Sequence, residues 1–496
     1  MTDFTFSDPN INARGTFSVN SHTITAPVYT KAELPDILAA TRRHAQAYYN
    51  GSRVAFDTLT QSYRLWSDPT YSQRQRALPI MAEITGFSPE NIACFGLAPL
   101  GLKTLDVPFL SALHEQLGLL IESGWYEAFT PWQHGLIKGY GSPSAALQER
   151  PRQILHNIAG NVVGPSWLAL MLGPIAQAPQ FVKLPKRDLV SYMFYLQTLE
   201  EIAPEFRRTI ACGYYEGGGD LEGDLMAESD VVMALGSNET MAALTDKLGR
   251  VNPRGRMLEH GWSLSFQVVS KAYATPEVAE LAAWGVAAHD GNACFSPANI
   301  YVEAGGPLSP TAFAEAVAAH LDTLAAQVPP KRTLAVAQRV TTYRQQQLKR
   351  RLTGKDVRVI KPKGSDYTVV IDASDPSLMP TCQERAVMIK PVKSFRDVPL
   401  YVEHLGGHLQ TVGLAVPYNE LPGIADRLGA RGATNVRMLG TEYVLDLAEC
   451  HDGLFNTAQM FMTDNLRWLS ASYFDTEHAI MDALAFKAAS LNTLAA

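Results

Sequence analysis

Cys294 is the residue whose type and surroundings fit covalent chemistry. It lies in the stretch Asp290–Pro297, which reads Asp-Gly-Asn-Ala-Cys-Phe-Ser-Pro, between an Ala-rich helical run over 276–289 and a strand-like run over 299–302. Backbone N–H groups in such a turn can point at an atom bonded to the sulfur. Because a cysteine thiolate is a strong nucleophile, we predict that Cys294 in its ionised form accepts an acyl group. A lone cysteine is more often buried filler, so the prediction depends on the residues that accompany it.

Two further residues have the chemistry that acyl transfer needs. Asn161 follows a strand-like run and is bordered by glycines, which let backbone or ligand come close. Its carboxamide, together with the backbone N–H of Cys294, is suited to bind a developing oxyanion; the alternative is a turn asparagine that caps the helix beginning at Pro165. Glu259 is a candidate general base, and its alternative is a charged residue at a strand end.

Two lysines stand where a strand leads into a helix. At the carboxyl end of a parallel strand, Lys183 can reach the ribose hydroxyls of a dinucleotide. Lys186 adds a second cation that could meet a 2′-phosphate, although a solvated charged loop explains it equally well. These two residues predict a cofactor-binding edge.

A strand-to-helix junction supplies the other cofactor candidates. Gly236, Ser237 and Glu239 follow the apolar run Val231–Leu235 and open a helix, whose N–H groups and dipole suit a pyrophosphate. The pattern is not GxGxxG, so this signal is weak by itself. Glu384 precedes a strand and could hold the nicotinamide ribose; the alternative is a surface carboxylate paired with an arginine.

Composition bounds the remaining classes of function. The net charge is −7 without long like-charge blocks, which gives no support for nucleic-acid binding. Residues 1–20 are polar and no run approaches 18 apolar residues, so we expect no integral membrane segment and a cytoplasmic protein. The five cysteines are scattered and fit a reducing compartment. His404 and His408 have i, i+4 spacing, but two intervening glycines spoil a helix, and we expect no metal site.

The elements that must position these residues begin with an N-terminal helical region over 1–152, which we expect to be part of the cofactor-binding lobe. It includes an amphipathic helix over 108–123 and an aromatic cluster from Trp125 to Trp132. Over 153–259, strands alternate with helices, which predicts a doubly wound, Rossmann-type parallel sheet. The expected strands are Ile154–Val163, Gln180–Lys183, Thr209–Tyr215 and Val231–Leu235, and the expected helices are Pro165–Gln177, Asp188–Ile202 and Asn238–Leu248.

A second α/β domain over 260–440 is expected to carry Cys294, and 441–496 to form a C-terminal segment that returns to the cofactor lobe or makes an oligomer contact. The expected helices are 276–288, 310–327, 333–352, 464–472 and 478–490, and the expected strands are 299–303, 357–361, 367–372 and 386–392.

The order and separations of the candidate residues resemble the aldehyde dehydrogenase superfamily. The shared pattern is an Asn after a strand, a Lys, Gly-Ser at a helix start, a Glu, the Cys and a second Glu. Within the superfamily, the chain is most similar to acyl-CoA reductases of the bacterial-luminescence (LuxC-like) type. The stretches that carry this resemblance are Gly160–Gly164, Ala234–Thr240, His260–Phe266, Asp290–Pro297, Leu409–Val412, Asp452-Gly453 and Arg467-Trp468.

The resemblance implies an α/β fold of the aldehyde dehydrogenase type and NADPH-dependent reduction of an acyl thioester to an aldehyde. Cys294 would attack an acyl-CoA or acyl-carrier-protein thioester, Asn161 would stabilise the oxyanion, and Glu259 would assist proton transfer. NADPH is preferred to NADH because Lys186 stands where an acidic residue would favour a free 2′-hydroxyl. The implied partners are the acyl donor, an acyl-transferring enzyme and further copies of the chain in a homo-oligomer.

Departures from the family pattern keep two alternatives open. The cysteine loop has Asp-Gly-Asn where the reductases are expected to have Asp-Gln, and the Lys183 stretch reads Lys-Leu-Pro-Lys rather than Lys-Pro-Ser. Glu259 matches the water-activating glutamate of aldehyde oxidisers, so one alternative is an NAD(P)-dependent aldehyde dehydrogenase. The other is a non-catalytic acyl-binding subunit.

Overall fold

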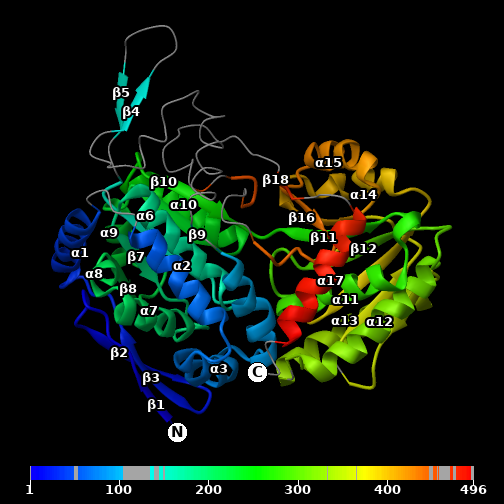
Figure 1. Ribbon diagram of the computed structural model, residues 1–496, viewed down its shortest axis with the longest axis horizontal. Helices are drawn as coiled ribbons and strands as arrows, with labels where there is room; N and C mark the ends of the chain where they lie inside the picture. Colours follow the sequence, from blue (N-terminus) through cyan, green and yellow to red (C-terminus); the bar gives the residue numbers. More distant parts are fainter. Residues whose placement is uncertain are drawn as a thin grey trace.

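The computed structural model describes residues 2–49, 54–103, 105, 135–138, 145–148, 151–331, 333–364, 366–445, 451–454, 456, 470–472 and 476–492. Within these ranges the chain forms two α/β lobes that lie side by side (Figure 1). The expected helix over 108–123, the aromatic cluster from Trp125 to Trp132, and Arg467 with Trp468 lie outside the described residues.

The described part of the first lobe is built on a parallel sheet with the strand order β10-β9-β6-β7-β8. Its strands are β6 Ile154–Asn157, β7 Gln180–Lys183, β8 Ile210–Gly213, β9 Val231–Leu235 and β10 Arg256–His260. The chain starts in the middle at β6, adds β7 and β8 on one side, and then returns to add β9 and β10 on the other. This reversal between β6 and β9 is a topological switch point, beyond whose carboxyl ends parallel sheets bind ligands.

Helices and smaller sheets complete the first lobe. The helices are α1 Leu34–Tyr48, α2 Val54–Ser67, α3 Ser72–Thr85, α4 Pro89–Asn91, α6 Leu172–Ala176, α7 Ser191–Ile202, α8 Pro204–Arg207, α9 Asp220–Ala227 and α10 Asn238–Val251. The strands β1 Thr2–Thr5, β2 Arg14–Val19 and β3 His22–Pro27 form one small sheet, and β4 Gly135–Lys138 pairs with β5 Ala145–Gln148 in a projecting hairpin (Figure 1). Trp167 stacks on Tyr195 in the core, with ring centroids 4.5 Å apart.

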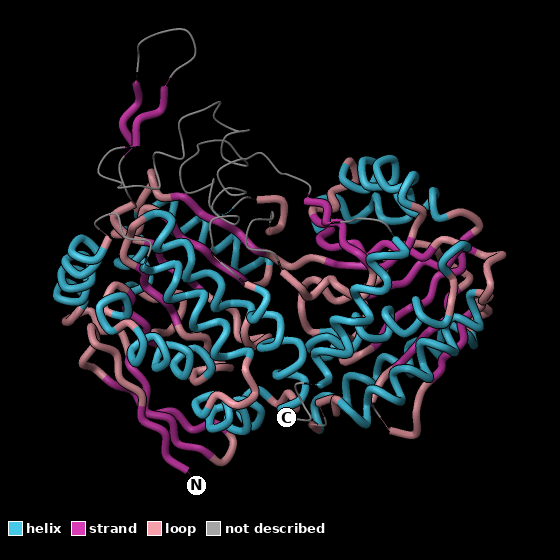
Figure 2. The backbone as a smooth tube through the Cα atoms, in the orientation of Figure 1, coloured by secondary structure: helices cyan, strands magenta, loops and turns pink. Residues whose placement is uncertain are grey.

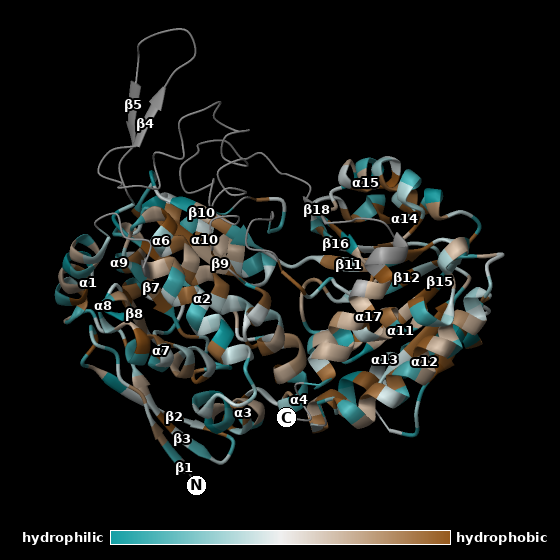
Figure 3. Ribbon diagram, viewed as in Figure 1, coloured by the Kyte–Doolittle hydropathy of each residue, from teal (hydrophilic) through white to brown (hydrophobic). Residues whose placement is uncertain are grey.

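The second lobe is built on a sheet whose described strands follow the order β13-β14-β15-β12-β11-β16-β17-β18, parallel except for β13. The strands are β11 Leu264–Val269, β12 Pro297–Glu303, β13 Val357–Ile360, β14 Thr368–Asp372, β15 Ala386–Val392, β16 Leu409–Ala415, β17 Asn435–Met438 and β18 Ser470–Ser472. The helices are α11 Pro276–Ala287, α12 Pro310–Gln327, α13 Leu334–Leu352, α14 Val398–Val402, α15 Leu421–Gly429 and α17 Thr476–Asn492. The helices of both lobes carry polar and apolar residues side by side, as elements that cover a sheet must (Figure 3).

The two sheets are joined by a very short connection. β10 ends at His260 and β11 begins at Leu264, so the chain passes from one sheet to the other through residues 261–263. The carboxyl end of the first sheet is thereby brought to the amino end of the second, and strands of each lobe lie on either side of this junction (Figure 2).

Most expected elements are present, and the differences have local causes. The expected strand Ile154–Val163 ends at Asn157, because the chain then turns through Gly160 to Gly164, whose φ is 97°. The expected helix Pro165–Gln177 starts as a 3₁₀ helix, Pro165–Met171, and becomes α-helical only at Leu172. Residues 470–472, expected at the end of a helix, form β18 because they pair with β17. Among the described residues, no helix combines the length and apolar character needed to cross a bilayer.

Candidate active site

A cavity of about 1400 Å³ lies where the two lobes meet. Residues that follow β6, β7, β9 and β10 line one side, and the Cys294 loop and the first residues of β16 and β17 line the other. The cavity therefore opens at the switch point of the first sheet. Its volume exceeds the roughly 300–1,000 Å³ of a site for one drug-sized ligand, so a dinucleotide and a second molecule have room.

The buried carboxylate of Asp290 fixes the loop that precedes Cys294. Its Oδ1 accepts hydrogen bonds from Arg385 Nε at 2.8 Å and Asn91 Nδ2 at 3.1 Å, and its Oδ2 accepts one from the Lys331 backbone N–H at 2.9 Å. The backbone N–H of Arg385 also donates to the Asp290 carbonyl at 3.0 Å. Contacts from three other segments thus hold one end of this loop.

The backbone on both sides of this ion pair is strained. His289 and Asp290 have φ values of 48° and 53°, and the three residues 383–385 have φ values of 62°, 52° and 54°. A left-handed conformation costs non-glycine residues roughly 1–2 kcal/mol each. The buried pair between Asp290 and Arg385 therefore holds two segments that would otherwise relax, and it places the cysteine loop at the cavity.

The surroundings of the Cys294 thiol work against the expected thiolate at rest. Burial, reinforced by the negative charge of Asp452, raises the pKa of Cys294 to about 12, although a hydrogen bond from the Gln410 side chain and the N–H groups of Phe295 and Cys294 oppose the rise. Ser265 Oγ donates to the Cys294 carbonyl at 2.7 Å, which fixes the backbone at this position. The thiolate must therefore be generated when a substrate is present.

The structure brings Asn161 to the cysteine loop. Its Nδ2 donates to the carbonyl of Asn292 at 3.1 Å, two residues before Cys294, and the Asn161 side chain lines the same cavity. A carboxamide nitrogen has two hydrogens, so one remains for a ligand oxygen. Asn161 and Cys294 are therefore the two predicted residues that lie together.

The lysines of the β7 end also line the cavity, on the side of the first lobe. Lys183 Nζ lies 5.2 Å from the centre of the Tyr215 ring, and burial lowers the pKa of Lys183, with Glu222 and Glu216 opposing. Lys186 is exposed, with its Nζ 4.0 Å from the Glu216 carboxylate.

The helix start after β9 is occupied by its own side chains. Ser237 Oγ accepts a hydrogen bond from the Thr240 N–H at 3.3 Å and caps α10. The Ser237 side chain and the N–H of Glu239 hydrogen-bond the Glu239 carboxylate and lower its pKa. Gly236, Ser237 and Glu239 all line the cavity, so a phosphate placed at this helix start would meet the negative charge of Glu239.

A family model described as acyl-CoA reductase (LuxC) matches residues 142–463, which is more than half of the chain. The chain belongs to the LuxC acyl-CoA reductase family. Membership supports an oxidoreductase that acts on acyl thioesters and aldehydes, and the family implies a nicotinamide cofactor without deciding between NADPH and NADH. A search of curated proteins found no match.

Solved structures show that this LuxC-family protein has the aldehyde dehydrogenase fold. Aldehyde dehydrogenase 21 of Physcomitrella patens, solved with succinate, is 11% identical, with 88% of this chain and 90% of that chain covered and a TM-score of 0.63. A putative aldehyde dehydrogenase, PutA, of Anabaena variabilis is 15% identical, with 87% and 90% covered and a TM-score of 0.60. An NADP-dependent enzyme of E. coli is 12% identical, with 86% of each chain covered and a TM-score of 0.63.

Two predicted residues of the LuxC-family chain are not brought to Cys294. Glu259 is exposed and does not belong to the cavity lining; its carboxylate accepts a hydrogen bond from Thr245 Oγ1 of α10 at 2.5 Å. Glu384 is buried and ion-paired with Arg339 of α13, and it is likewise absent from the lining. Their roles as general base and ribose ligand stay predictions that this geometry does not support.

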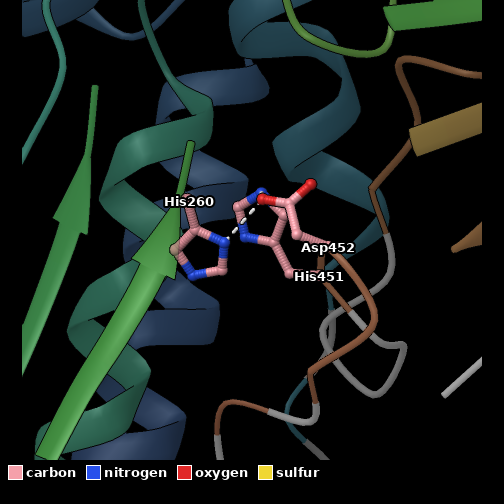
Figure 4. Close-up of side chains that lie close together, drawn as sticks. All are labelled: His260, His451 and Asp452. Carbon is pink, nitrogen blue, oxygen red and sulfur yellow. Dashed lines mark hydrogen bonds and ion pairs between the residues drawn. The ribbon is translucent and has the colours of Figure 1, made fainter. Parts of the chain in front are cut away.

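A cluster that the sequence reasoning missed lies in the same cavity. His260 Nδ1 is 2.7 Å from Asp452 Oδ2, and the rings of His260 and His451 stack with centroids 3.8 Å apart (Figure 4). Gln410 Nε2 donates to the other carboxylate oxygen of Asp452. The stretches containing His260, Gln410 and Asp452 had carried the LuxC-like resemblance, which was the available signal, but residue type and spacing gave these residues no role.

Proposed function

We propose that this protein uses NADPH to reduce an acyl-CoA or acyl-carrier thioester to the aldehyde, through an acyl thioester on Cys294. The observation that carries the proposal is the placement of Cys294 and Asn161 together at the switch-point edge of the first sheet. That edge is where a doubly wound sheet binds a nucleotide, so the sulfur and the cofactor would share one cavity. Family membership supports the thioester as substrate.

Cys294 and Asn161 act together in the acyl-transfer step. The Cys294 thiol loses its proton, and the sulfur forms a bond to the acyl carbon while Asn161 and the Cys294 N–H hold the oxyanion. The carrier sulfur then leaves and takes up a proton. NADPH, when bound, supplies the hydride that reduces the acyl group. The carbon–sulfur bond to Cys294 breaks, the aldehyde departs, and Cys294 regains a proton.

The cations at the first-lobe side of the cavity fit an anionic cofactor. Lys183, Lys186 and Arg187 all line this side, and two of them are exposed at its rim. Lys183 is suited to the ribose hydroxyls and Lys186 to a 2′-phosphate. The Glu239 carboxylate at the α10 start works against a phosphate there, so the lysines would carry most of the recognition.

Replacing Lys186 by Glu is expected to shift the cofactor preference towards NADH. A hydrogen bond to a charged group contributes roughly 1.5–3 kcal/mol, so the ratio of kcat/KM for NADPH over NADH should fall about 10- to 100-fold. Steady-state rates with both cofactors measure it, and Lys355→Glu, an exposed lysine of the other lobe, is the control. An unchanged ratio would remove Lys186 from cofactor recognition.

Intact mass after mixing with acyl-CoAs of several chain lengths tests the function. We expect an acyl adduct on the protein, which NADPH clears with release of aldehyde. NADPH consumption with acyl-CoA should exceed NADP⁺ reduction with aldehyde and water. An adduct that NADPH does not clear would favour an acyl-binding subunit, and acid production from aldehyde without any adduct from acyl-CoA would favour the oxidising alternative.

A further inference from the structure

The ring of His260 is oriented by a buried carboxylate. The His260 side chain is 2% exposed, and its Nδ1 lies 2.7 Å from Asp452 Oδ2 (Figure 4). An ionised carboxylate can only accept a hydrogen bond, so Nδ1 carries a hydrogen, and in the neutral form of the ring Nε2 carries the lone pair. Nε2 is buried and has no hydrogen-bond partner in the part of the chain that the structure describes.

A tight turn fixes the position of the Asp452 carboxylate. His451 and Leu454 exchange two backbone hydrogen bonds of 2.9 Å around Asp452 and Gly453, whose φ values are 52° and 78°. Two consecutive positive φ values are what a tight turn of the Asp-Gly type requires. Burial would raise the pKa of Asp452, but the neighbouring imidazoles and the hydrogen bonds from His260 and Gln410 outweigh it and lower the pKa to about 2. Asp452 is therefore ionised at neutral pH.

One side chain connects this pair to the nucleophile. Gln410 Nε2 donates to Asp452, and the Gln410 side chain also lowers the pKa of Cys294; Cys294, Gln410, Asp452 and His260 all line the cavity. Ser265 Oγ connects the Cys294 loop to β16, because it donates to the Cys294 carbonyl at 2.7 Å and accepts from the Thr411 N–H at 3.0 Å. The thiol of Cys294 and the His260–Asp452–Gln410 chain of hydrogen bonds thus line one cavity.

A shared metal ion does not explain the cluster. The ligand atoms of His260, His451 and Asp452 lie within 4.8 Å of one another. The two rings, however, are stacked with only 18° between their planes. A metal must lie near the plane of each imidazole at about 2.0–2.1 Å from its nitrogen, and two nearly parallel planes do not meet within that distance. The stacked geometry instead packs one imidazole against the other.

We propose that His260, positioned by Asp452, is the general base and general acid for Cys294, an inference that rests on the proposed function. The lone pair of His260 Nε2 takes the Cys294 proton, directly or through one water, as the sulfur bonds the acyl carbon. The imidazolium then returns that proton to the departing carrier sulfur, which leaves as a thiol. After reduction of the acyl group, a proton from solvent reaches Cys294 through the same nitrogen as the carbon–sulfur bond breaks.

This assignment accounts for the position of Glu259. Successive side chains of a strand point to opposite faces, so His260 turns into the cavity while Glu259 faces α10. Two titratable groups, Asp452 and His451 of the 451–454 turn, contact His260, and Cys294 and Arg437 of β17 line the same cavity. Burial, with His260 adding to it, lowers the pKa of His451 to about 4, so the stacked neighbour is neutral.

The test follows the rate of acyl-adduct formation on Cys294 against pH, by rapid quench and intact mass. At pH 7 the wild-type rate should be fast, because His260 removes the Cys294 proton. His260→Asn keeps a donor to Asp452 but loses the base, so the rate at pH 7 should fall about 10²- to 10⁴-fold. It should then increase about tenfold per pH unit up to at least pH 9, because only the unassisted thiol remains.

Asp452→Asn separates a positioning role from a merely structural one. Removing the negative charge should lower the pKa of Cys294, which moves the alkylation profile to lower pH, while loss of the correct His260 tautomer slows acylation. The expected result is a slower acylation at pH 7 together with an alkylation profile at lower pH. Acylation at the wild-type rate in a variant whose alkylation profile has moved to lower pH would overturn the proposal. His320→Asn on α12, outside the cavity lining, is the matched control for the substitution.

Two results would remove His260 from the mechanism. One is a wild-type acylation rate in His260→Asn at pH 7, and the other is loss of acylation in Glu259→Gln while His260→Asn retains it. If the wild type forms no adduct with any acyl-CoA, the proposed function fails by itself. Iodoacetamide labelling of Cys294 then tests the role of His260 without an acyl donor. Labelling at pH 7 that is at least tenfold slower in His260→Asn than in the wild type supports this role, and equal labelling overturns it.

Discussion

Cys294→Ala is expected to lose both the acyl adduct and aldehyde formation. No other described thiol combines a place in the cavity wall with a neighbouring carboxamide, so among the described residues no second thiol is placed to take over. Removing the nucleophile of a covalent mechanism typically costs at least about 10⁴-fold in rate. Intact mass with acyl-CoA and NADPH consumption measure the two losses in parallel.

Cys382→Ala is the matched control for this prediction. Cys382 is also partly exposed, and burial followed by the charge of Glu384 raises its pKa to about 12, the same value as for Cys294. It does not line the cavity, so its variant should form the adduct and reduce the thioester at the wild-type rate. Reduction that survives in Cys294→Ala, or is lost in Cys382→Ala, would end the covalent mechanism.

The comparison of these two thiols shows what makes a cysteine a nucleophile here. Burial raises the pKa of both thiols, so a low pKa does not single out Cys294. The difference lies in what surrounds the sulfur: Gln410 lowers its pKa, Asn161 holds the adjacent loop, and the Asp452–His260 pair lines the same cavity. Reactivity in this site therefore depends on proton removal during the reaction rather than on a stored thiolate.

Local sequence signals were sufficient for most elements of the fold. The apolar runs Gln180–Lys183, Val231–Leu235 and Ala386–Val392 lie between turn signals and form β7, β9 and β15 at the expected bounds. The ordered motifs also led to the correct family and fold. Strands β10, β11, β16 and β17 were not predicted, because Arg, His, Gln and Asn in them weaken the apolar run. His260, Gln410, Asn435 and Arg437 of these strands line the cavity between the two lobes, which no local pattern reveals.

The sequence predicted a site residue only where that residue stands at the end of a recognisable strand or helix. Asn161 and Cys294 each stand at the end of an identifiable element, and the structure brings them together. Glu259 and His260 are adjacent on β10, and a register difference of one residue decides which of them enters the cavity. His260 reaches its carboxylate across 192 positions of sequence, so its role depends on tertiary packing rather than on spacing.

Arg385→Met is expected to destabilise the second lobe and to slow acylation. Arg385 and Asp290 are 0% and 1% exposed, and the Arg385 guanidinium also donates to the Val328 carbonyl at 2.9 Å. Removing one partner leaves the other charge buried without its counter-charge, which costs roughly 3–5 kcal/mol in the free energy of unfolding. Urea unfolding measures this loss. The Cys294 loop also loses its anchor, so the rate of adduct formation should fall in the protein that remains folded.

Two further variants test whether the effect of Arg385→Met comes from the buried ion pair. Arg358→Met removes an exposed arginine paired with Glu315 in the same lobe, and its free energy of unfolding should change by no more than about 0.5 kcal/mol. Asp290→Asn keeps a residue type that tolerates a positive φ, so its loss of stability isolates the charge from the backbone strain. If Arg385→Met and Arg358→Met unfold at the same urea concentration, the buried pair does not hold the loop. The position of Cys294 would then have to come from Asn161 and Ser265 alone.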